Sequence, residues 1–295
     1  KEDILQQHLE HIFPMINERI TAPIPIWRYY KKKKDRTLEN SLEAIEQTIM
    51  QFINVARERL AQNQKLKESP SNFLEALLVA QEVEGTITDK EIYGNVFTLL
   101  LAGEDTTSNS LSWALYFLAQ HPELVKKIRK EALDCYGEKD LPDAYEDLSA
   151  LKLAEAVAKE TIRIKPVTPN LYMQANEDLE INGLKVEKGT TIMLQNKVAQ
   201  TKEAYFSEAD TFIPERWLKG ACPHLQQHSP EIIKAFGGGA RYCPGKNLAM
   251  VEMTLCISSL CKKFDMALAQ PAEEVKEIFS FTMYPDNLHI NFKKV

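Results

Sequence analysis

The sequence lacks several features that would assign a protein class at once. Its longest unbroken apolar runs hold a handful of residues, such as residues 99–102, far short of the ~20 that a membrane-spanning helix needs. Basic residues are not in excess, with 36 against 42 acidic ones and a formal net charge of −6, which argues against general nucleic-acid binding. The five cysteines form no CxxC pair, so we expect reduced thiols and a cytoplasmic or cytosol-facing location.

The start of the chain also lacks an initiator methionine and a signal-peptide pattern. We therefore expect the sequence to be the interior of a longer chain. What is present is ordinary for a globular protein: 295 residues, of which 44% are hydrophobic and 26% charged, enough for one large domain or two smaller ones.

Helical spacing dominates the first half of the chain. Apolar residues recur at this spacing over residues 38–60, and a shorter helix is predicted after Pro70. Prolines before residue 38, beginning with Pro14, are expected to break the chain. The four lysines at 31–34 are predicted to be a solvated loop, with a membrane-surface or acidic-partner role as the alternative. Residues 89–120 are predicted to form a long central helix, opened by a capping box at Thr88 and Glu91.

The second half mixes helices with short strands. Further helices are predicted at 122–133, at 148–164 and from 246 to about 263. Alternating segments around Asn182-Gly183 and Lys188-Gly189 indicate a hairpin, and the tail 278–293 is predicted to form strands around a turn at 285–287. The fold class expected from the residues is mainly α with minor β.

The most informative segment is residues 236–245, Phe-Gly-Gly-Gly-Ala-Arg-Tyr-Cys-Pro-Gly. Its spacing fails both the Walker pattern and the dinucleotide fingerprint. A thiolate in a tight loop fits better, because the glycines allow positive φ and close approach to a flat ligand. The following helix N-terminus favours negative charge at Cys243, and Arg241 is placed to pair with a ligand carboxylate.

This segment resembles the haem-ligand loop of the cytochrome P-450 family, Phe-x-x-Gly-x-Arg-x-Cys-x-Gly, at every specified position. The resemblance implies that haem b is the cofactor, that Cys243 is the axial thiolate to the iron and that Arg241 contacts a haem propionate. The other cofactor-binding positions that it implies are Phe236, Gly239 and Gly245.

The central helix contains Gly103-Glu104-Asp105-Thr106-Thr107, an unusual cluster of poor helix formers. Alone, such a segment is typical of a solvated helix face. Beside Cys243 it resembles the family's oxygen-binding segment, which assigns Thr106 to hydrogen bonding with dioxygen at the iron and Asp105 to a proton relay.

An ion-pair scaffold is predicted next. Glu160 and Arg163 lie at i, i+3 in an apolar helix and match the family's Glu-x-x-Arg signature. Residues 214–216 match its later Pro-Glu-Arg segment. The resemblance implies a structural network of Glu160, Arg163 and Arg216 that fixes the segment before the cysteine loop.

The match also departs from the family. Met173 stands where an arginine that binds a propionate is common, which puts one haem contact in doubt. The specific matches begin near residue 90, and the resemblance implies that the family's N-terminal third, with any membrane anchor, lies outside this sequence. We therefore expect one P-450 domain over 1–295, N-terminally incomplete, with helices in 1–88, the oxygen-binding helix at 89–120, and ion-pair helix, small sheets and haem loop in 148–295.

The function implied is that of an iron-dependent oxidoreductase, a monooxygenase acting on a small apolar substrate and dioxygen. Because no flavin, nicotinamide or iron–sulfur motif is present, a ferredoxin or flavoprotein reductase would supply electrons. The alternatives are a peroxide-using or isomerising haem-thiolate enzyme, or a truncated fragment that does not hold haem. Substrate-facing candidates by resemblance are Thr98, Leu101, Ala102, Val167, Thr168, Phe281 and Thr282. Docking of the electron donor is expected at Lys126, Lys127, Arg129, Lys130, Arg241, Lys246, Lys262 and Lys263.

Overall fold

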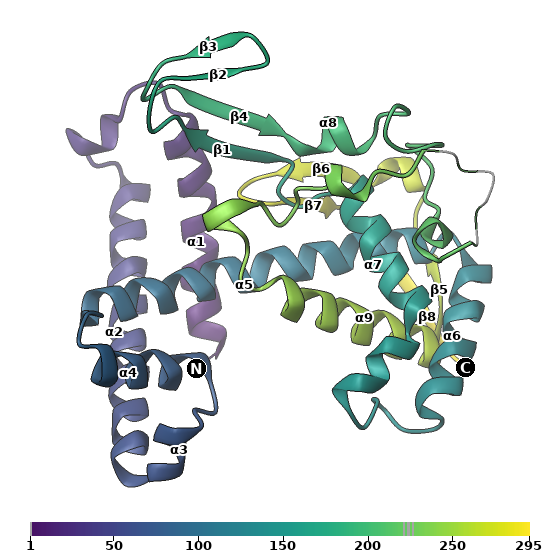
Figure 1. Cartoon of the computed structure of the whole chain (residues 1–295), viewed down its shortest axis with the longest axis horizontal. Coiled ribbons are helices and arrows are strands. Elements are labelled where there is room, and N and C mark those ends of the chain that lie inside the picture. Colours follow the sequence, from purple (N-terminus) through teal and green to yellow (C-terminus); the bar gives the residue numbers. More distant parts are fainter. Residues whose placement is uncertain (1, 221, 223–224, 226) are drawn as a thin grey trace. The chain divides into compact units, whose positions relative to one another are not determined.

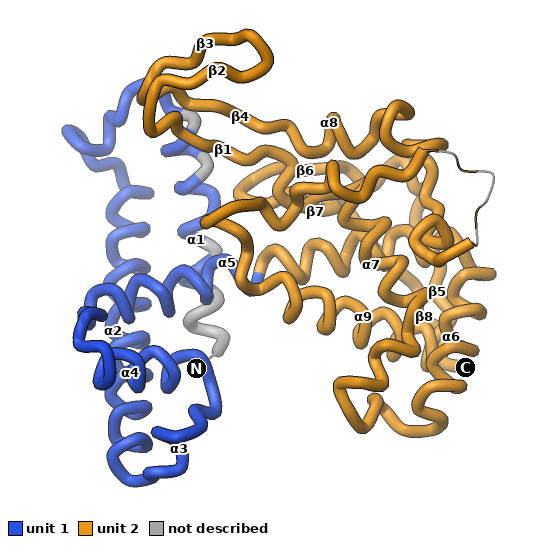
Figure 2. The backbone as a smooth tube through the Cα atoms, viewed as in Figure 1, with its two compact units in different colours: residues 1–104 blue, residues 105–295 orange. Residues whose placement is uncertain are grey.

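The computed structural model describes residues 2–220, 222, 225 and 227–295 (Figure 1). It is mainly helical with a minor share of strand, as the sequence predicts. The chain divides into two compact units, residues 1–104 and residues 105–295 (Figure 2). No helix of the described residues combines the length and apolar character that crossing a bilayer requires.

The first unit is helical. It holds α1 (Glu2–Thr21), α2 (Lys33–Gln62), α3 (Gln64–Glu68), α4 (Phe73–Glu84) and the first half of α5 (Asp89–Leu118). One stripe of α2, including Ile45, Ile49 and Ile53, is fully buried against α1 and α4. This stripe follows the 3.6-residue period, so the amphipathic pattern determines which face packs inward.

One expectation for this unit is wrong, and another holds in part. Pro14 does not break the chain but lies inside α1, where Leu9, Ile12 and Met15 on both sides of it are buried. Packing of these residues offsets the cost of a proline in a helix, about 3 kcal/mol. The lysine run is solvated, as expected, since all four residues are exposed, but only its first half is loop. It contains the start of α2, and Lys31 and Lys34 form ion pairs with Glu39 and Glu18.

The start of α5 is as predicted. The Thr88 hydroxyl accepts the Glu91 N–H at 3.2 Å, and Glu91 accepts the Thr88 N–H at 2.7 Å, which completes the capping box. These two bonds satisfy donors that a helix start leaves unpaired, and so determine where α5 begins.

The second unit packs helices around one core. It contains residues 105–118 of α5, α6 (Pro122–Tyr136), α7 (Lys152–Ile164), α8 (Asn196–Gln200) and α9 (Lys246–Lys263). Buried residues of α5, α6, α7 and α9, such as Phe117, Ile128, Val157 and Ile257, form a single cluster. The helix predicted at 148–164 begins later, at Lys152, since Tyr145–Ala150 forms a 3-10 helix before it.

Short antiparallel pairs complete the second unit. They are β1 (Asn170–Gln174) with β4 (Thr191–Gln195), β2 (Leu179–Ile181) with β3 (Leu184–Val186), β5 (Phe264–Leu268) with β8 (Ile290–Lys294), and β6 (Lys276–Phe279) with β7 (Met283–Asp286). The hairpin at Asn182-Gly183 is as predicted, with φ of 47° and 82°. The tail forms strands on either side of a turn at Asn287, as predicted, but β7 pairs with β6 through a turn at 280–282, and β8 pairs with β5.

Candidate functional site

The cysteine loop is closed by its own backbone. The Cys243 N–H donates to the carbonyl of Phe236 at 2.9 Å, and the Gly237 N–H donates to the carbonyl of Lys234 at 2.8 Å. Gly237 and Gly239 have φ of 71° and 61°, a region that other residues rarely adopt. The glycines that the sequence places here are thus needed for a turn that brings Phe236 beside Cys243.

The sulfur of Cys243 lies close to Gly245, the residue directly before α9. A Cβ atom added to Gly245 would lie 3.8 Å from the Cys243 Sγ, and α9 begins at the next residue, Lys246. Cys243 is a free, half-buried thiol. A side chain at 245 would be in van der Waals contact with the sulfur, and glycine leaves that side of it uncovered.

The donor set shows what kind of metal group the sulfur can hold. Within the described part of the chain, no three His, Cys, Asp or Glu residues are grouped closely enough to bind a metal ion. A haem needs only one protein donor such as Cys243, because the porphyrin supplies the other equatorial ligands of the iron. Arg241 and Gly239 are exposed at the same loop, while Phe236 is half-buried, so the residues present fit a haem.

The ion-pair scaffold is centred on a buried carboxylate that accepts five hydrogen bonds. Glu160, which is fully buried, accepts bonds from Arg163 Nε and Nη2, Arg216 Nε and Trp217 Nε1, each at 2.9 Å, and from the Ile213 N–H at 3.0 Å. The sequence predicts the three charged members but misses Trp217. An aromatic residue directly after Pro-Glu-Arg was the available signal.

The two arginines extend this network into the chain before the cysteine loop. Arg163 Nη1 donates to the carbonyls of Gln200 and Ala209, at 2.9 and 2.7 Å. Arg216 donates to the carbonyls of Ser207 and Glu208, at 2.9 and 3.1 Å. The network therefore fixes a loop-rich segment that has few regular backbone bonds of its own.

The acid and alcohol of α5 are half-buried neighbours. Asp105 accepts a bond from Asn109 at 3.0 Å and a second from the hydroxyl of Thr282, while the Thr106 carbonyl accepts the Ser110 hydroxyl at 2.8 Å. The sequence reasoning missed Asn109, although its i+4 spacing from Asp105 places both on one helix face.

The substrate candidates have different surroundings. Thr98 and Ala102 are exposed, Leu101 is half-buried against the core of the first unit, and Val167, Thr168 and Phe281 are half-buried. Thr282 differs from the expectation, since it is 1% exposed and its hydroxyl is bonded to Asp105 and Asn109. That hydroxyl is therefore not available to a substrate. Met173 lies exposed on β1, where it pairs with Ile192.

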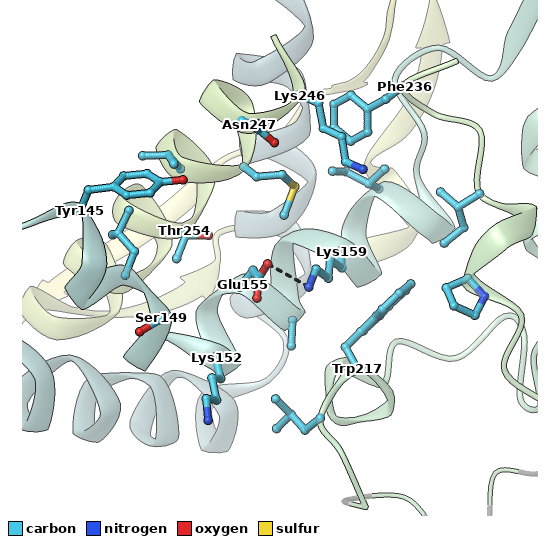
Figure 3. A pocket seen from close by; sticks show the side chains of 18 of the residues that line it. Tyr145, Ser149, Lys152, Glu155, Lys159, Trp217, Phe236, Lys246, Asn247 and Thr254 are labelled. Atoms are coloured by element: carbon cyan, nitrogen blue, oxygen red, sulfur yellow. Dashed lines mark ion pairs between the residues drawn. The ribbon is translucent and has the colours of Figure 1, made fainter. Parts of the chain in front are cut away.

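A groove of about 1390 Å³ borders the cysteine loop (Figure 3). Its lining includes Phe236, Gly237, Tyr242 and Lys246 from the loop and the start of α9, together with residues of α7, α9 and the 3-10 helix before α7. Four lysines line it: Lys152, Lys159, Lys219 and Lys246. In Figure 3 a dashed line joins Lys159 to Glu155, at 2.8 Å, and Lys246 Nζ lies 5.7 Å from the ring centroids of both Phe236 and Tyr242.

Glu131 of α6 also lines the groove, where it caps α7. It accepts the N–H groups of Leu153 and Ala154 at 2.7 and 3.1 Å. Burial raises the pKa of the Glu131 carboxyl, and the bonds from Leu153 and Ala154 offset part of that rise.

Several cations expected to receive an electron donor have partners within the chain. Lys127 pairs with Glu215, Arg129 with Asp265, Lys130 with Asp134 and Lys263 with Asp140, and Lys262 donates to a backbone carbonyl. Arg129 also donates to the carbonyls of Cys261 and Phe264 and is half-buried. These contacts make Arg129 a structural residue, whereas Lys126 and Arg241 of the expected set are exposed.

Comparisons with known proteins agree on one family. The model of the family described as Cytochrome P450 matches residues 1–292. The chain is 32% identical over 270 residues to "Sterol 26-hydroxylase, mitochondrial" of Oryctolagus cuniculus, which covers 90% of this chain and 49% of that protein. It is 32% identical over 216 residues to "Cytochrome P450 4V2" of Homo sapiens, which covers 73% and 41%.

A solved structure shows the same fold. The crystal structure of a cytochrome P450, CYP102L1, matches with a TM-score of 0.76 at 23% identity, over 96% of this chain and 64% of that one. The chain spans about half the length of the curated relatives that it matches.

Proposed function

The chain belongs to the cytochrome P450 family, and on that premise we propose that the protein is a haem-thiolate monooxygenase. The reaction is insertion of one oxygen atom of O2 into an apolar organic substrate. The observation that carries the proposal is the closed loop that holds the half-buried Cys243 sulfur beside Gly245, directly before α9.

Haem b would be held by residues of this loop. Cys243 binds the iron as thiolate, Arg241 pairs with a propionate, and Phe236 shields the sulfur from water. When bound, haem supplies the centre at which dioxygen is activated, with electron density contributed by the thiolate. The Glu160 network keeps the segment before the loop in place.

Asp105 and Thr106 would supply the protons that activation of dioxygen consumes. Consecutive helical residues do not face each other, and the Asp105 carboxylate is turned toward Asn109 and Thr282. A proton held on Asp105 therefore reaches the Thr106 hydroxyl only after the carboxyl rotates or through an intervening water.

Electrons come from a separate ferredoxin or flavoprotein reductase, which we place at the groove beside the cysteine loop. The groove holds four lysines against three glutamates, Glu131, Glu146 and Glu155, and the exposed Lys152 and Lys219 favour an acidic partner surface. A partner seated there would lie against Phe236 and Tyr242 of the loop itself.

The substrate is proposed only as a class, a small apolar molecule. Four relatives, from four mammals, are named as sterol 26-hydroxylases, and others at similar identity carry names that specify no substrate. A cytoplasmic or cytosol-facing location also stays a proposal, supported by five free cysteines.

The carbon monoxide difference spectrum of the reduced protein tests the proposal. We expect the long-wavelength Soret band of thiolate ligation in the wild type and in Cys256→Ser, a matched control at an exposed cysteine of α9. Cys243→Ser should lose the band, and retention of the band would refute the assignment of the ligand.

Two further measurements separate the alternatives. Turnover with peroxide and no electron donor, at rates equal to the reconstituted system, would favour a peroxide-using enzyme. Haem titration of residues 1–295 alone tests whether this chain retains the cofactor without the rest of a longer protein.

A further inference from the structure

Three side chains of the second unit form a closed ring of hydrogen bonds. Asn109 Nδ2 donates to Asp105 Oδ1 at 3.0 Å and to Thr282 Oγ1 at 2.9 Å. The Thr282 hydroxyl donates to Asp105 Oδ2 and so closes the ring. The ring joins one turn of α5 to a residue 177 positions away in the sequence, at the turn between β6 and β7.

The number of donors determines the direction of each bond. An amide has two N–H groups, a hydroxyl has one O–H, and an ionised carboxylate only accepts. The ring uses each of these three protons once and gives each oxygen of Asp105 one donor. The ring closes in this way when Asp105 only accepts, and a proton placed on Oδ2 along the line to Thr282 would require the Thr282 hydroxyl to turn away.

Thr282 is a rigid anchor for this arrangement. It is 1% exposed, and its carbonyl accepts the Ser280 N–H at 3.1 Å. The next residue, Met283, donates its N–H to the carbonyl of Val167 at 2.8 Å and accepts Trp113 Nε1 at 3.3 Å. The hydroxyl is thus presented by a backbone that is bonded on both sides.

We propose that Thr282 and Asn109 are positioning residues that hold the Asp105 carboxylate, so that the turn between β6 and β7 controls proton delivery by α5. The inference rests on the proposed relay role of Asp105. Release of Oδ2 by Thr282 is the movement that lets the Asp105 carboxyl take up a proton and rotate toward Thr106. No electron transfer is involved, since one proton moves between oxygen atoms.

The first test is a double-mutant cycle in the haem-loaded protein, read as the midpoint of chemical denaturation. Thr282→Val removes the hydroxyl with little change of shape. We expect it to lower the midpoint in the wild type, and to lower it by less than half as much in the Asp105→Ala background. Equal shifts in both backgrounds would show that the two side chains do not interact, and would overturn the proposal.

The second test measures the fraction of consumed dioxygen that is released as hydrogen peroxide, with a ferredoxin, its reductase and an apolar compound that shifts the haem spin state. General acid–base groups contribute ~10²- to 10⁴-fold to a reaction rate. Because Asp105 itself is kept when only its positioning is lost, we expect part of this effect, a rise in peroxide release of about threefold to tenfold. We expect this rise in Thr282→Val, with the carbon monoxide band retained, and a return to the wild-type fraction in Thr282→Ser.

The rescue distinguishes positioning from packing, because Ser keeps the hydroxyl but loses the methyl group. Asn109→Ala tests the other donor of the ring independently and should raise peroxide release in the same direction, even where Thr282→Val fails to fold. Ser112→Ala, on the same helix with its hydroxyl bonded to the Ser108 carbonyl, is the matched control and should change nothing.

Failure of the inference and failure of the relay are separable. When Asp105→Ala raises peroxide release but Thr282→Val and Asn109→Ala do not, the positioning inference is wrong and the relay stands. When Asp105→Ala itself leaves peroxide release unchanged, the relay is wrong and the inference falls with it.

Discussion

Replacement of Trp217 by phenylalanine is the sharpest test of how the loop-rich segment is held. Trp217 Nε1 gives one of the five bonds received by the buried Glu160 carboxylate, at 2.9 Å. A hydrogen bond to a charged group contributes about 1.5–3 kcal/mol. For a unit of residues 105–295, a loss of this size lowers the melting temperature by about 3–12 °C.

The packing change of Trp217→Phe is separated from the lost bond by repeating it in the Glu160→Gln background. Gln offers one oxygen where Glu160 offers two, and its amide faces the guanidinium groups of Arg163 and Arg216. We expect Glu160→Gln alone to cost about 3 kcal/mol or more, since it leaves buried charges incompletely paired.

Thermal unfolding of the four proteins, followed by circular dichroism, provides the cycle. The account predicts that Trp217→Phe costs clearly less when Gln occupies position 160. Identical costs in both backgrounds would show that the indole stabilises the fold only by its volume, and the reasoning about the carboxylate would be refuted.

Other predictions concern separate parts of the chain. Gly237→Ala should reduce haem incorporation, because Gly237 has φ of 71° and an added Cβ would lie 3.4 Å from a backbone oxygen. Gly238→Ala is the control and should not, since Gly238 lies in extended backbone with open space around it. Spectral titration with haem measures both. Hydrogen bonds from Ser71 lower the pKa of Glu75, so its stabilisation is complete above the unfolded value of 4.5 and is lost as the pH falls through the lowered folded value. The free energy of unfolding should therefore fall less in Glu75→Gln than in the wild type as the pH is lowered through this range. Denaturant unfolding at a series of pH values measures this fall, and equal falls in both proteins would contradict the prediction. Burial raises the pKa of Cys261 to about 12, so alkylation followed by mass spectrometry should label it only after unfolding.

The sequence predicts the helices well where an amphipathic period or a cap is local. The start of α5 follows from Thr88 and Glu91, and the start of α9 from the Pro244-Gly245 pair. Pro14 shows the limit of such rules. The sequence shows the local cost of a proline in a helix, but it does not show the packing of α1 against α2 that offsets this cost.

Long-range pairing is the part that the sequence could not supply. The tail's alternation predicts strands but not that β8 leaves β7 to pair with β5, since register depends on contacts outside the segment. The same holds at the candidate site. Asp105 is visible as an acid on a helix, whereas its bond with Thr282 depends on the placement of a turn far along the chain.

The most direct test of the central claim is X-ray absorption at the iron edge of the haem-loaded protein. The account predicts one sulfur neighbour of the iron in the wild type, replaced by oxygen or nitrogen in Cys243→Ser and retained in Cys256→Ser. A wild-type spectrum without sulfur, or a sulfur neighbour that survives Cys243→Ser, would contradict the account.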